Sequence, residues 1–161
     1  MLFSIMPQTA KKFILTKDGL IDLKHEYDEL VNGKRPAITE RIQRAREFGD
    51  LSENSEYDAA KEEQSLLEAR IAELEEVLHK AQIVELDKKT DFVVIGSTVI
   101  VEIEGVQDEF TIVGTMEADP AKRKISNESP VGQALLGAKV GEAVEVATPI
   151  VRARYKILEI K

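Results

Sequence analysis

The chain has 161 residues and no cysteine, with 43% hydrophobic, 32% charged and 5% aromatic residues and a formal net charge of −8. This length accommodates one ordinary domain or two small domains with an aliphatic core, and the lack of cysteine excludes disulfides and thiolate sites. Proteins that hold duplex DNA are usually basic, so the negative charge argues against stable binding to free DNA and favours a protein partner with a basic surface or channel.

The N-terminal segment, residues 1–10, is interpreted as a loose tail, because its apolar stretch is too short for a signal peptide. No apolar run reaches the roughly 20 residues that a membrane span needs. His25 and His79 are far apart in sequence, and neither has a neighbour at metal-ligand spacing. We therefore expect a cytoplasmic protein with no membrane partner and no metal site or cofactor of its own.

Residues 16–82 have a helical pattern with one interruption. Thr16 is a good N-cap, and apolar residues follow it at three- and four-residue spacing over residues 20–30 and again over residues 38–45. Residues 32–36, with the letters NGKRP, predict a local break or kink between the two stretches.

The second helix, expected from about residue 51 to residue 81, has a cleaner pattern. Its seam alternates steps of three and four, as in a heptad repeat: Tyr57, Ala60, Gln64, Leu67, Ile71, Leu74, Leu78 and Ala81. Helices with single narrow apolar stripes bury them against each other, and the short connection at residues 48–50 makes the two helices antiparallel neighbours. We predict a hairpin about 46 Å long instead of a compact bundle.

The pattern changes from helical to strand-like after the second helix. Five segments are rich in β-branched or alternating residues and are expected as strands: residues 93–95, 98–103, 110–113, 143–147 and 151–160. One short helix is expected among them, capped by Ser129, with Pro130 in its first turn and Gly137 at its end. The predicted fold class is two-domain α+β, with a long antiparallel helical hairpin over residues 1–86 and a small α+β domain over residues 87–161.

The connection between the two helices carries a pair of acidic residues, Asp50 and Glu53. Gly49 permits the turn, and the three-residue spacing is expected to place both carboxylates on one side of the first helical turn. A capping box explains the same letters, and the spacing alone favours that purely structural explanation. An acidic pair at the end of a long hairpin also suits delivery of two carboxylates to a hard cation such as Mg²⁺ in a site elsewhere.

The two predicted helices differ in charge near this tip. Residues 34–46 contain five basic residues and one acid, whereas residues 50–76 contain ten acids and two bases. Facing helices of opposite sign can simply pair with each other, although individual surface pairs contribute little to stability. Arginines near the tip can instead contact a phosphate backbone. Both explanations stay open, because each can hold for different residues.

Four stretches, at residues 45–61, 70–74, 125–130 and 134–137, resemble the GreA/GreB family of bacterial transcript cleavage factors. Residues 45–61 read AREFGDLSENSEYDAAK, which is similar to the family's tip motif, and Arg70-Ile71 followed by Leu74 matches the descending helix. The letters ISNESP at residues 125–130 and ALLG at residues 134–137 resemble the C-terminal signature. The resemblance runs from about residue 14 to residue 160.

The resemblance implies an N-terminal antiparallel coiled coil and a C-terminal domain similar to FK506-binding proteins. It also implies that the globular domain docks on RNA polymerase at the rim of the secondary channel, while the coiled coil reaches the polymerase active centre. There the factor stimulates the polymerase's own endonucleolytic cleavage of backtracked RNA. The protein is then expected to be a monomer that is no enzyme by itself and meets the DNA of the transcription complex only indirectly.

The family's functional residues carry over to three groups of positions. Asp50 and Glu53 match the two acidic residues that help the polymerase hold a second Mg²⁺ and orient or activate the attacking water. Arg46 and Lys61 match the basic patch that contacts the extruded RNA 3′ segment. The polymerase-docking region is matched by Ser129, Pro130, Leu135 and Gly137.

Two features of the sequence depart from the family pattern. Phe48 stands where relatives tend to have a polar residue, although the acidic pair is untouched. The kink predicted at residues 32–36 conflicts with the single long first helix of the family, and we expect packing against the second helix to keep that helix together.

Four alternative functions share some of these sequence features. An inhibitory relative would share the fold and the docking but would not promote cleavage, and the intact acidic pair argues against it. A GreB subtype would carry a more extended basic patch, so the acidic bias after residue 50 favours the GreA subtype. A prolyl isomerase needs an aromatic-lined pocket, for which the globular half offers only Phe92, Phe110 and Tyr155. A coiled-coil adaptor without chemistry is the remaining alternative.

Overall fold

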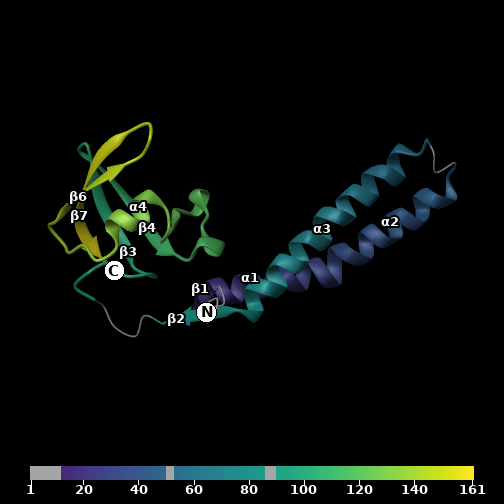
Figure 1. The fold of residues 1–161 in the computed structure, drawn as a ribbon, viewed down its shortest axis with the longest axis horizontal. Coiled ribbons are helices and arrows are strands. Elements are labelled where there is room, and N and C mark those ends of the chain that lie inside the picture. Colours follow the sequence, from purple (N-terminus) through teal and green to yellow (C-terminus); the bar gives the residue numbers. More distant parts are fainter. Residues whose placement is uncertain (1–11, 50–52, 86–89) are drawn as a thin grey trace, which may run out of the picture. The chain divides into compact units, whose positions relative to one another are not determined.

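The computed structural model describes residues 12–49, 53–85 and 90–161 (Figure 1). These residues form two compact units: Asp18–His79 is one, and the described residues of the segments 1–17 and 80–161 form the other. The first unit is helical and the second is rich in strands, which confirms the predicted two-domain α+β class. The predicted tail at residues 1–10 and the predicted boundary between residues 86 and 87 lie outside the described residues.

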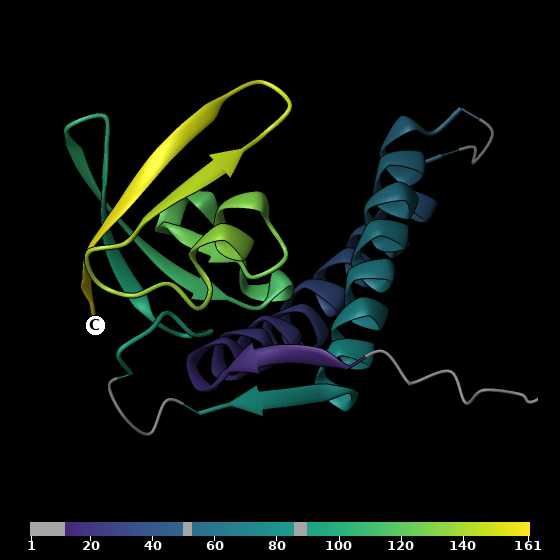
Figure 2. The ribbon, with the colours of Figure 1, turned by 60° about the vertical axis from the view of Figure 1, so that its left-hand side comes forward.

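The helical unit is a hairpin of two antiparallel arms. The first arm runs through α1 (Lys17–Glu29), the π-helical turn η1 (Leu30–Lys34) and α2 (Arg35–Glu47), and the second arm is α3 (Ser55–His79). Figures 1 and 2 both show α2 and α3 side by side. None of the described helices is long and apolar enough to cross a membrane.

The π-helical turn resolves the conflict between a kinked and a continuous first arm. Pro36 lies in the first turn of α2 and has no N–H group, and the backbone N–H of Arg35 bonds the carbonyl of Leu30, five residues back. The buried positions accordingly step from Leu30 to Ile38, eight residues instead of seven. With this extra residue in the turn, the apolar residues of α2 face the second arm again. The interruption therefore alters the helical hydrogen bonding locally but does not end the first arm.

The seam of α3 follows the predicted spacing except at its end. The buried residues on α3 are Ala60, Leu67, Ile71, Leu74 and Val77. Leu78, predicted in the seam, is only half-buried, and Ala81 begins a strand. The 25 residues of α3 span about 37 Å, which is shorter than predicted because the helix starts later and stops earlier.

The globular unit is built on a five-stranded sheet with the order β5-β4-β3-β7-β6. Its strands are β3 (Thr98–Ile103), β4 (Val106–Val113), β5 (Lys124–Ser126), β6 (Ala143–Ala147) and β7 (Arg152–Ile160). Neighbouring strands are antiparallel, except that β4 and β5 are parallel. Glu104 and Gly105 join β3 to β4 with φ angles of 49° and 82°, as a tight hairpin turn requires.

The short helix α4 (Pro130–Leu135) packs on this sheet and begins as predicted. The Ser129 hydroxyl accepts a hydrogen bond from the Gly132 N–H at 3.1 Å, which makes Ser129 the N-cap. The core contains Leu135 from α4 and the central residues of the strands. Residues 93–95 are no strand, contrary to the prediction, because the Val93 N–H and C=O bond Ala138 and Gly137 in the loop after α4.

A second, two-stranded sheet was missed by the sequence pattern. It pairs β1 (Phe13–Thr16) in parallel with β2 (Ala81–Val84), on either side of the helical unit along the chain. Glu117, at the end of the 3-10 turn η2 (Thr115–Glu117), accepts hydrogen bonds from the backbone N–H of Thr16 at 2.8 Å and from its hydroxyl. The strand β1 therefore belongs to the globular unit.

Candidate functional site at the tip of the hairpin

The start of α3 is capped by Asn54 and not by the acidic residues before it. The Asn54 Oδ1 atom accepts a hydrogen bond from the Tyr57 N–H at 3.1 Å, and the Asn54 carbonyl accepts one from the Asp58 N–H. Glu53 precedes the helix in a bend, so the expectation that it lies in the first helical turn is wrong. The capping-box explanation fails for the same reason, because Glu53 is not at the third position of the helix.

Asn54 also ties the second arm back to the first. Its Nδ2 atom donates to the Ala45 carbonyl at 2.6 Å, and the same carbonyl accepts a hydrogen bond from the Phe48 N–H at 3.4 Å. Sequence reasoning missed this residue, although asparagine directly before a helix is a recognised capping signal. One carbonyl thus fixes the chain on both sides of the turn.

The acidic pair is only partly visible in the structure. Asp50 lies outside the described residues, and Glu53 is exposed and forms no hydrogen bond or ion pair with the other described residues. Within the described segments, no group of three or more His, Cys, Asp or Glu side chains is arranged to hold a metal ion. A carboxylate is a donor that Mg²⁺ accepts, but any ion held by Glu53 would need most of its ligands from a partner.

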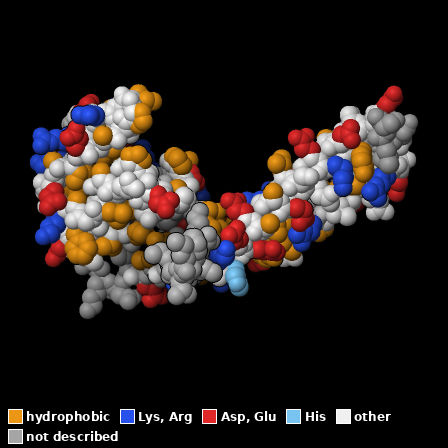
Figure 3. Space-filling view, viewed as in Figure 1, with side chains coloured by type: hydrophobic (Ala, Val, Ile, Leu, Met, Phe, Trp, Pro, Cys, Tyr) orange, Lys and Arg blue, Asp and Glu red, His pale blue; other side chains and the backbone are white. Residues whose placement is uncertain are grey.

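Most of the basic residues on the first arm pair with acids. Arg35 forms two hydrogen bonds of 2.8 Å with Glu68, and the guanidinium lowers the pKa of that carboxyl. Arg41 contacts Glu56 at 2.8 Å and also bonds Glu63. Figure 3 shows basic and acidic side chains close together along the hairpin. Pairing between facing helices therefore explains these charges.

Arg46 and Lys61 differ from these paired residues. Within the part of the chain that the structure describes, neither forms an ion pair with a carboxylate, and both line an open hollow of about 400 Å³ on the hairpin. Neutral side chains complete this hollow: Thr39, Ile42, Gln43 and Gln64. Lys61 Nζ donates to Gln64 Oε1 at 3.1 Å. The structure thus brings together the two residues predicted as a basic patch.

Tyr57 orients one of these cations. The Arg46 guanidinium lies over the Tyr57 ring, 5.8 Å from its centroid, a cation–π arrangement that crosses from one arm to the other. The sequence pattern assigned Tyr57 only to the helical seam, where it is half-buried. The contact of Tyr57 with Arg46 depends on which residue of the first arm faces the ring. The spacing of residues within one helix does not reveal this.

The residues predicted to dock on a partner lie around the start and end of α4. Pro130 and Gly137 are exposed, and Ser129 is half-buried by its capping bond. Leu135 has 0% exposure and belongs to the core, so it can act on a docking surface only by supporting the loop from beneath.

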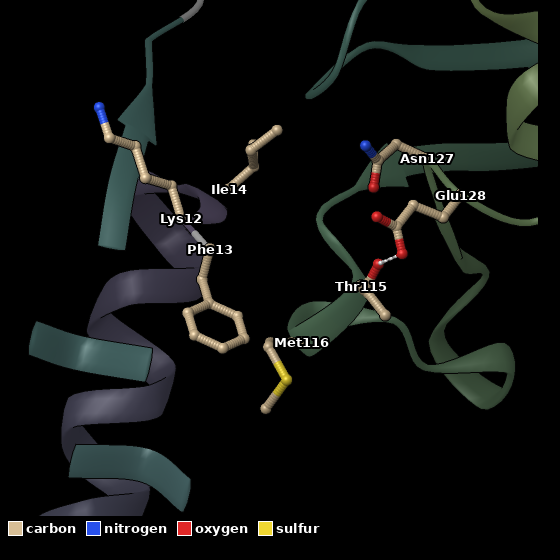
Figure 4. Close-up of a pocket in the computed structure, with 7 residues that line it drawn as sticks. All are labelled: Lys12, Phe13, Ile14, Thr115, Met116, Asn127 and Glu128. Carbon is tan, nitrogen blue, oxygen red and sulfur yellow. Dashed lines mark hydrogen bonds between the residues drawn. The ribbon is translucent and has the colours of Figure 1, made fainter. Parts of the chain in front are cut away.

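A pocket of about 130 Å³ within the globular unit lies between β1 and the segments around Thr115 and Asn127 (Figure 4). The residues that line it are Lys12, Phe13, Ile14, Thr115, Met116, Asn127 and Glu128. In Figure 4 the Phe13 ring and the Met116 side chain lie near each other at one end, and the Glu128 carboxylate accepts a hydrogen bond from the Thr115 hydroxyl at 3.0 Å. The lining of the pocket thus comes both from β1 and from the segments around Thr115 and Asn127.

The aromatic residues of the globular unit pack on one another. The rings of Phe110 and Tyr155 are stacked with centroids 6.5 Å apart, and both contact the core. Phe92 is 45% exposed. Because two of the three rings are committed to mutual packing, they argue against the aromatic pocket that a prolyl isomerase needs.

Comparison with known proteins links both units to one family. The family described as "Transcription elongation factor, N-terminal" matches residues 13–83, and "Transcription elongation factor, GreA/GreB, C-term" matches residues 88–161. The chain is 52% identical over 155 residues to transcription elongation factor GreA of Thermoanaerobacter pseudethanolicus, covering 94% of this chain and 99% of the relative.

A second relative has a similar identity and coverage. GreA of Acetivibrio thermocellus is 49% identical over 156 residues, covering 95% of this chain and 98% of that protein. Among solved structures, GreA factor homolog 1 (Gfh1) of Thermus thermophilus is 30% identical with a TM-score of 0.45, covering 94% of this chain and 99% of that one.

Proposed function

Since the chain belongs to the GreA/GreB family of transcription elongation factors, we propose that it stimulates RNA polymerase's own cleavage of backtracked nascent RNA. The hairpin enters the secondary channel of the polymerase, in the cytoplasm, and supplies acidic residues in trans. The protein is no nuclease by itself. Cleavage frees a new RNA 3′ end, from which an arrested complex resumes elongation.

The exposed Glu53 carboxylate is the observation that carries this proposal. Asn54 provides the cap of α3, so the acid beside it is not needed to start the helix. An exposed carboxylate at the turn of a hairpin stabilises the fold little, and its position instead suits contact with a partner. Asp50, three residues earlier, is the second member of the proposed pair.

The two carboxylates would act together inside the polymerase. They offer hard oxygen donors that complete a ligand set begun by the polymerase, and they orient the attacking water by accepting its hydrogen bonds. A second Mg²⁺, when held there, neutralises charge that develops during phosphodiester hydrolysis. The chain needs no cofactor of its own for this role.

Arg46 and Lys61 would hold the RNA. Arg35 and Arg41 are paired with acids on the facing arm, whereas Arg46 and Lys61 form no ion pair among the described residues. The charges of Arg46 and Lys61 are therefore available for phosphate groups. The stacking of Arg46 on Tyr57 reduces the number of positions its guanidinium can take, which favours a defined contact with the RNA 3′ segment.

The docking surface on the polymerase would be the exposed part of the loop around α4. Ser129, Pro130 and Gly137 present backbone and side-chain atoms there, and Leu135 supports them from the core. This surface is separate along the chain from the acidic pair. Substitutions at the tip should therefore leave the affinity for polymerase nearly unchanged.

Stalled, backtracked polymerase complexes with labelled RNA test the proposal. The parent protein should accelerate RNA cleavage, and Asp50→Asn and Glu53→Gln should each reduce that acceleration by about 100-fold or more. Glu62→Gln, which removes an exposed acid further along α3, is the matched control and should behave as the parent. Competition with labelled parent protein should show that all variants still bind.

An inhibitory factor of the same fold is the second candidate. It would bind the stalled complex without accelerating cleavage, and it would slow nucleotide addition. The presence of both acids at the tip favours stimulation. If parent protein and both acidic variants give equal cleavage rates, the catalytic assignment of Asp50 and Glu53 is wrong.

A further inference from the structure

Phe48 is the most exposed aromatic residue among those the structure describes. It follows α2 directly, and 87% of its surface is accessible to solvent. A phenylalanine in this state adds nothing to the core. Single exposed apolar residues are common on protein surfaces, so exposure alone assigns no role to Phe48. Its position and its neighbours are what distinguish it.

The backbone at Phe48 is held in place. Its N–H bonds the Ala45 carbonyl at 3.4 Å, and that carbonyl also accepts the hydrogen bond from Asn54 across the tip. Phe48 is therefore a ring at the anchored end of α2. A side chain that projects from an anchored backbone loses less conformational entropy when it binds.

Phe48 is close to the proposed reaction centre along the chain. It precedes Asp50 by two residues, a stretch of chain that spans at most about 7 Å. The axis of a duplex advances about 3.4 Å per nucleotide of one strand, so this stretch of chain is comparable with the length of one or two nucleotides. A ring at residue 48 thus reaches bases within one or two nucleotides of a phosphate that Asp50 attends.

Phe48 and two cations of the hairpin match parts of a surface for single-stranded nucleic acid. Such surfaces combine cations for phosphates with aromatic faces on which bases stack, without regard to sequence. Arg46 and Lys61 provide the cations. The Tyr57 ring already lies under the Arg46 guanidinium, whereas the Phe48 ring is open. Phe48 is thus the aromatic face on which a base can stack.

We propose that Phe48 stacks on an unpaired base of the RNA 3′ segment and positions the neighbouring phosphate for the acidic pair. This inference rests on the proposed function and adds a positioning residue to it. An apolar wall of a protein partner is the competing contact for Phe48. Arg46 and Lys61, which form no ion pair among the described residues, favour RNA, and the substitutions below separate the two.

Stimulated cleavage is compared for the parent, Phe48→Leu and Phe48→Tyr. Leucine keeps the apolar character but removes the aromatic face, and tyrosine keeps the face. With ordinary RNA, Phe48→Leu should slow stimulated cleavage about tenfold and Phe48→Tyr should stay within about twofold of the parent. With an abasic nucleotide at the RNA 3′ end, all three proteins should cleave at the same reduced rate. Since residue 48 is exposed, none of these changes should affect folding.

A second readout does not depend on cleavage. The Glu53→Gln background is combined with RNA that carries 2-aminopurine, a fluorescent adenine analogue, at its 3′ end in the stalled complex. Phe48 should change this fluorescence by stacking, and Phe48→Leu should abolish the change. Equal behaviour of phenylalanine and leucine in both assays would overturn the inference, as would an equal loss with ordinary and abasic RNA, which indicates a protein contact. If the parent does not stimulate cleavage, the proposed function is wrong. The fluorescence change with Phe48, compared with Phe48→Leu, then shows by itself whether Phe48 stacks on the base.

Discussion

A single side chain, Asn54, controls the geometry of the tip. Its amide oxygen caps α3 through Tyr57, and its amide nitrogen bonds the Ala45 carbonyl on the other arm. An aspartate would keep the first contact but place an acceptor against an acceptor in the second. Asn54 is therefore the only common residue of its size that satisfies both contacts, and the position of Glu53 beside it depends on them.

Substitution of Asn54 should separate capping from the link between the arms. Asn54→Ala removes both contacts and should destabilise the start of α3 by about 1 kcal/mol. Asn54→Asp should keep the Tyr57 N–H protected from hydrogen exchange and still lose stimulated cleavage, because the tip is no longer tied to Ala45. Hydrogen exchange at Tyr57 and the cleavage rate measure the two effects. Full cleavage activity of Asn54→Asp would show that the link across the tip has no functional role.

At the scale of elements, the two arms are joined by buried apolar residues and by surface ion pairs. The pair of Arg35 and Glu68 connects the beginning of α2 to the middle of α3. Both side chains are partly exposed, so the pair contributes little in concentrated salt. The pair instead helps to fix the register of the two arms, because it would be broken if one helix shifted along the other.

Acid should weaken the hairpin partly through this pair. Arg35 lowers the pKa of Glu68 below its ordinary value of 4.5, so the pair stabilises the hairpin at pH values above the ordinary one. That contribution is lost as the pH falls through the lowered value of the folded protein. Urea unfolding followed by helical circular dichroism should show a larger loss of stability between pH 7 and pH 3 for the parent than for Glu68→Gln. An equal loss in both, at low salt, would contradict the prediction.

Helices and strands with a long periodic pattern could be predicted from the sequence, whereas the short strands that pair in parallel could not. The arms of the hairpin and the strands β3, β4, β6 and β7 have enough residues for their period to appear. In contrast, β1, β2 and β5 have three or four residues each, and the parallel pairing of β1 with β2 joins segments that are far apart in sequence. Residues 93–95 look like a strand because the core is apolar there, although their backbone bonds a loop.

The same distinction applies to the candidate site. Arg46 and Lys61 were predicted from the resemblance to the family's tip motif, and the structure brings them to one hollow. The bond from Asn54 to Ala45 and the contact of Arg46 with Tyr57 connect two arms, so no spacing within one helix reveals them. The later start of α3 follows from Asn54, whose side chain accepts the hydrogen bond of the Tyr57 N–H and so caps the helix.

At the scale of the whole molecule, the globular unit contains residues from both ends of the hairpin. The strand β1 precedes α1, β2 follows α3, and the two pair with each other. Thr16 and Glu117 are hydrogen-bonded although 101 residues separate them. The globular unit is therefore complete only when the chain on both sides of the hairpin has folded, which links the formation of the two units.

Gly114 is the position at which this arrangement can be tested. A β-carbon there would lie 1.8 Å from the backbone oxygen of Ile14, so Gly114→Ala must displace β1. We expect the globular unit to lose about 1–3 kcal/mol, because the clash is with backbone and no side chain can rotate away from it. Amide hydrogen exchange should accelerate in β1 and β2 in particular. Gly33→Ala is the control, since a methyl group there meets nothing within 4 Å and removes a flexible residue from a helical arm. Unchanged exchange in β1 for Gly114→Ala would mean that this strand is not held by the sheet domain in solution.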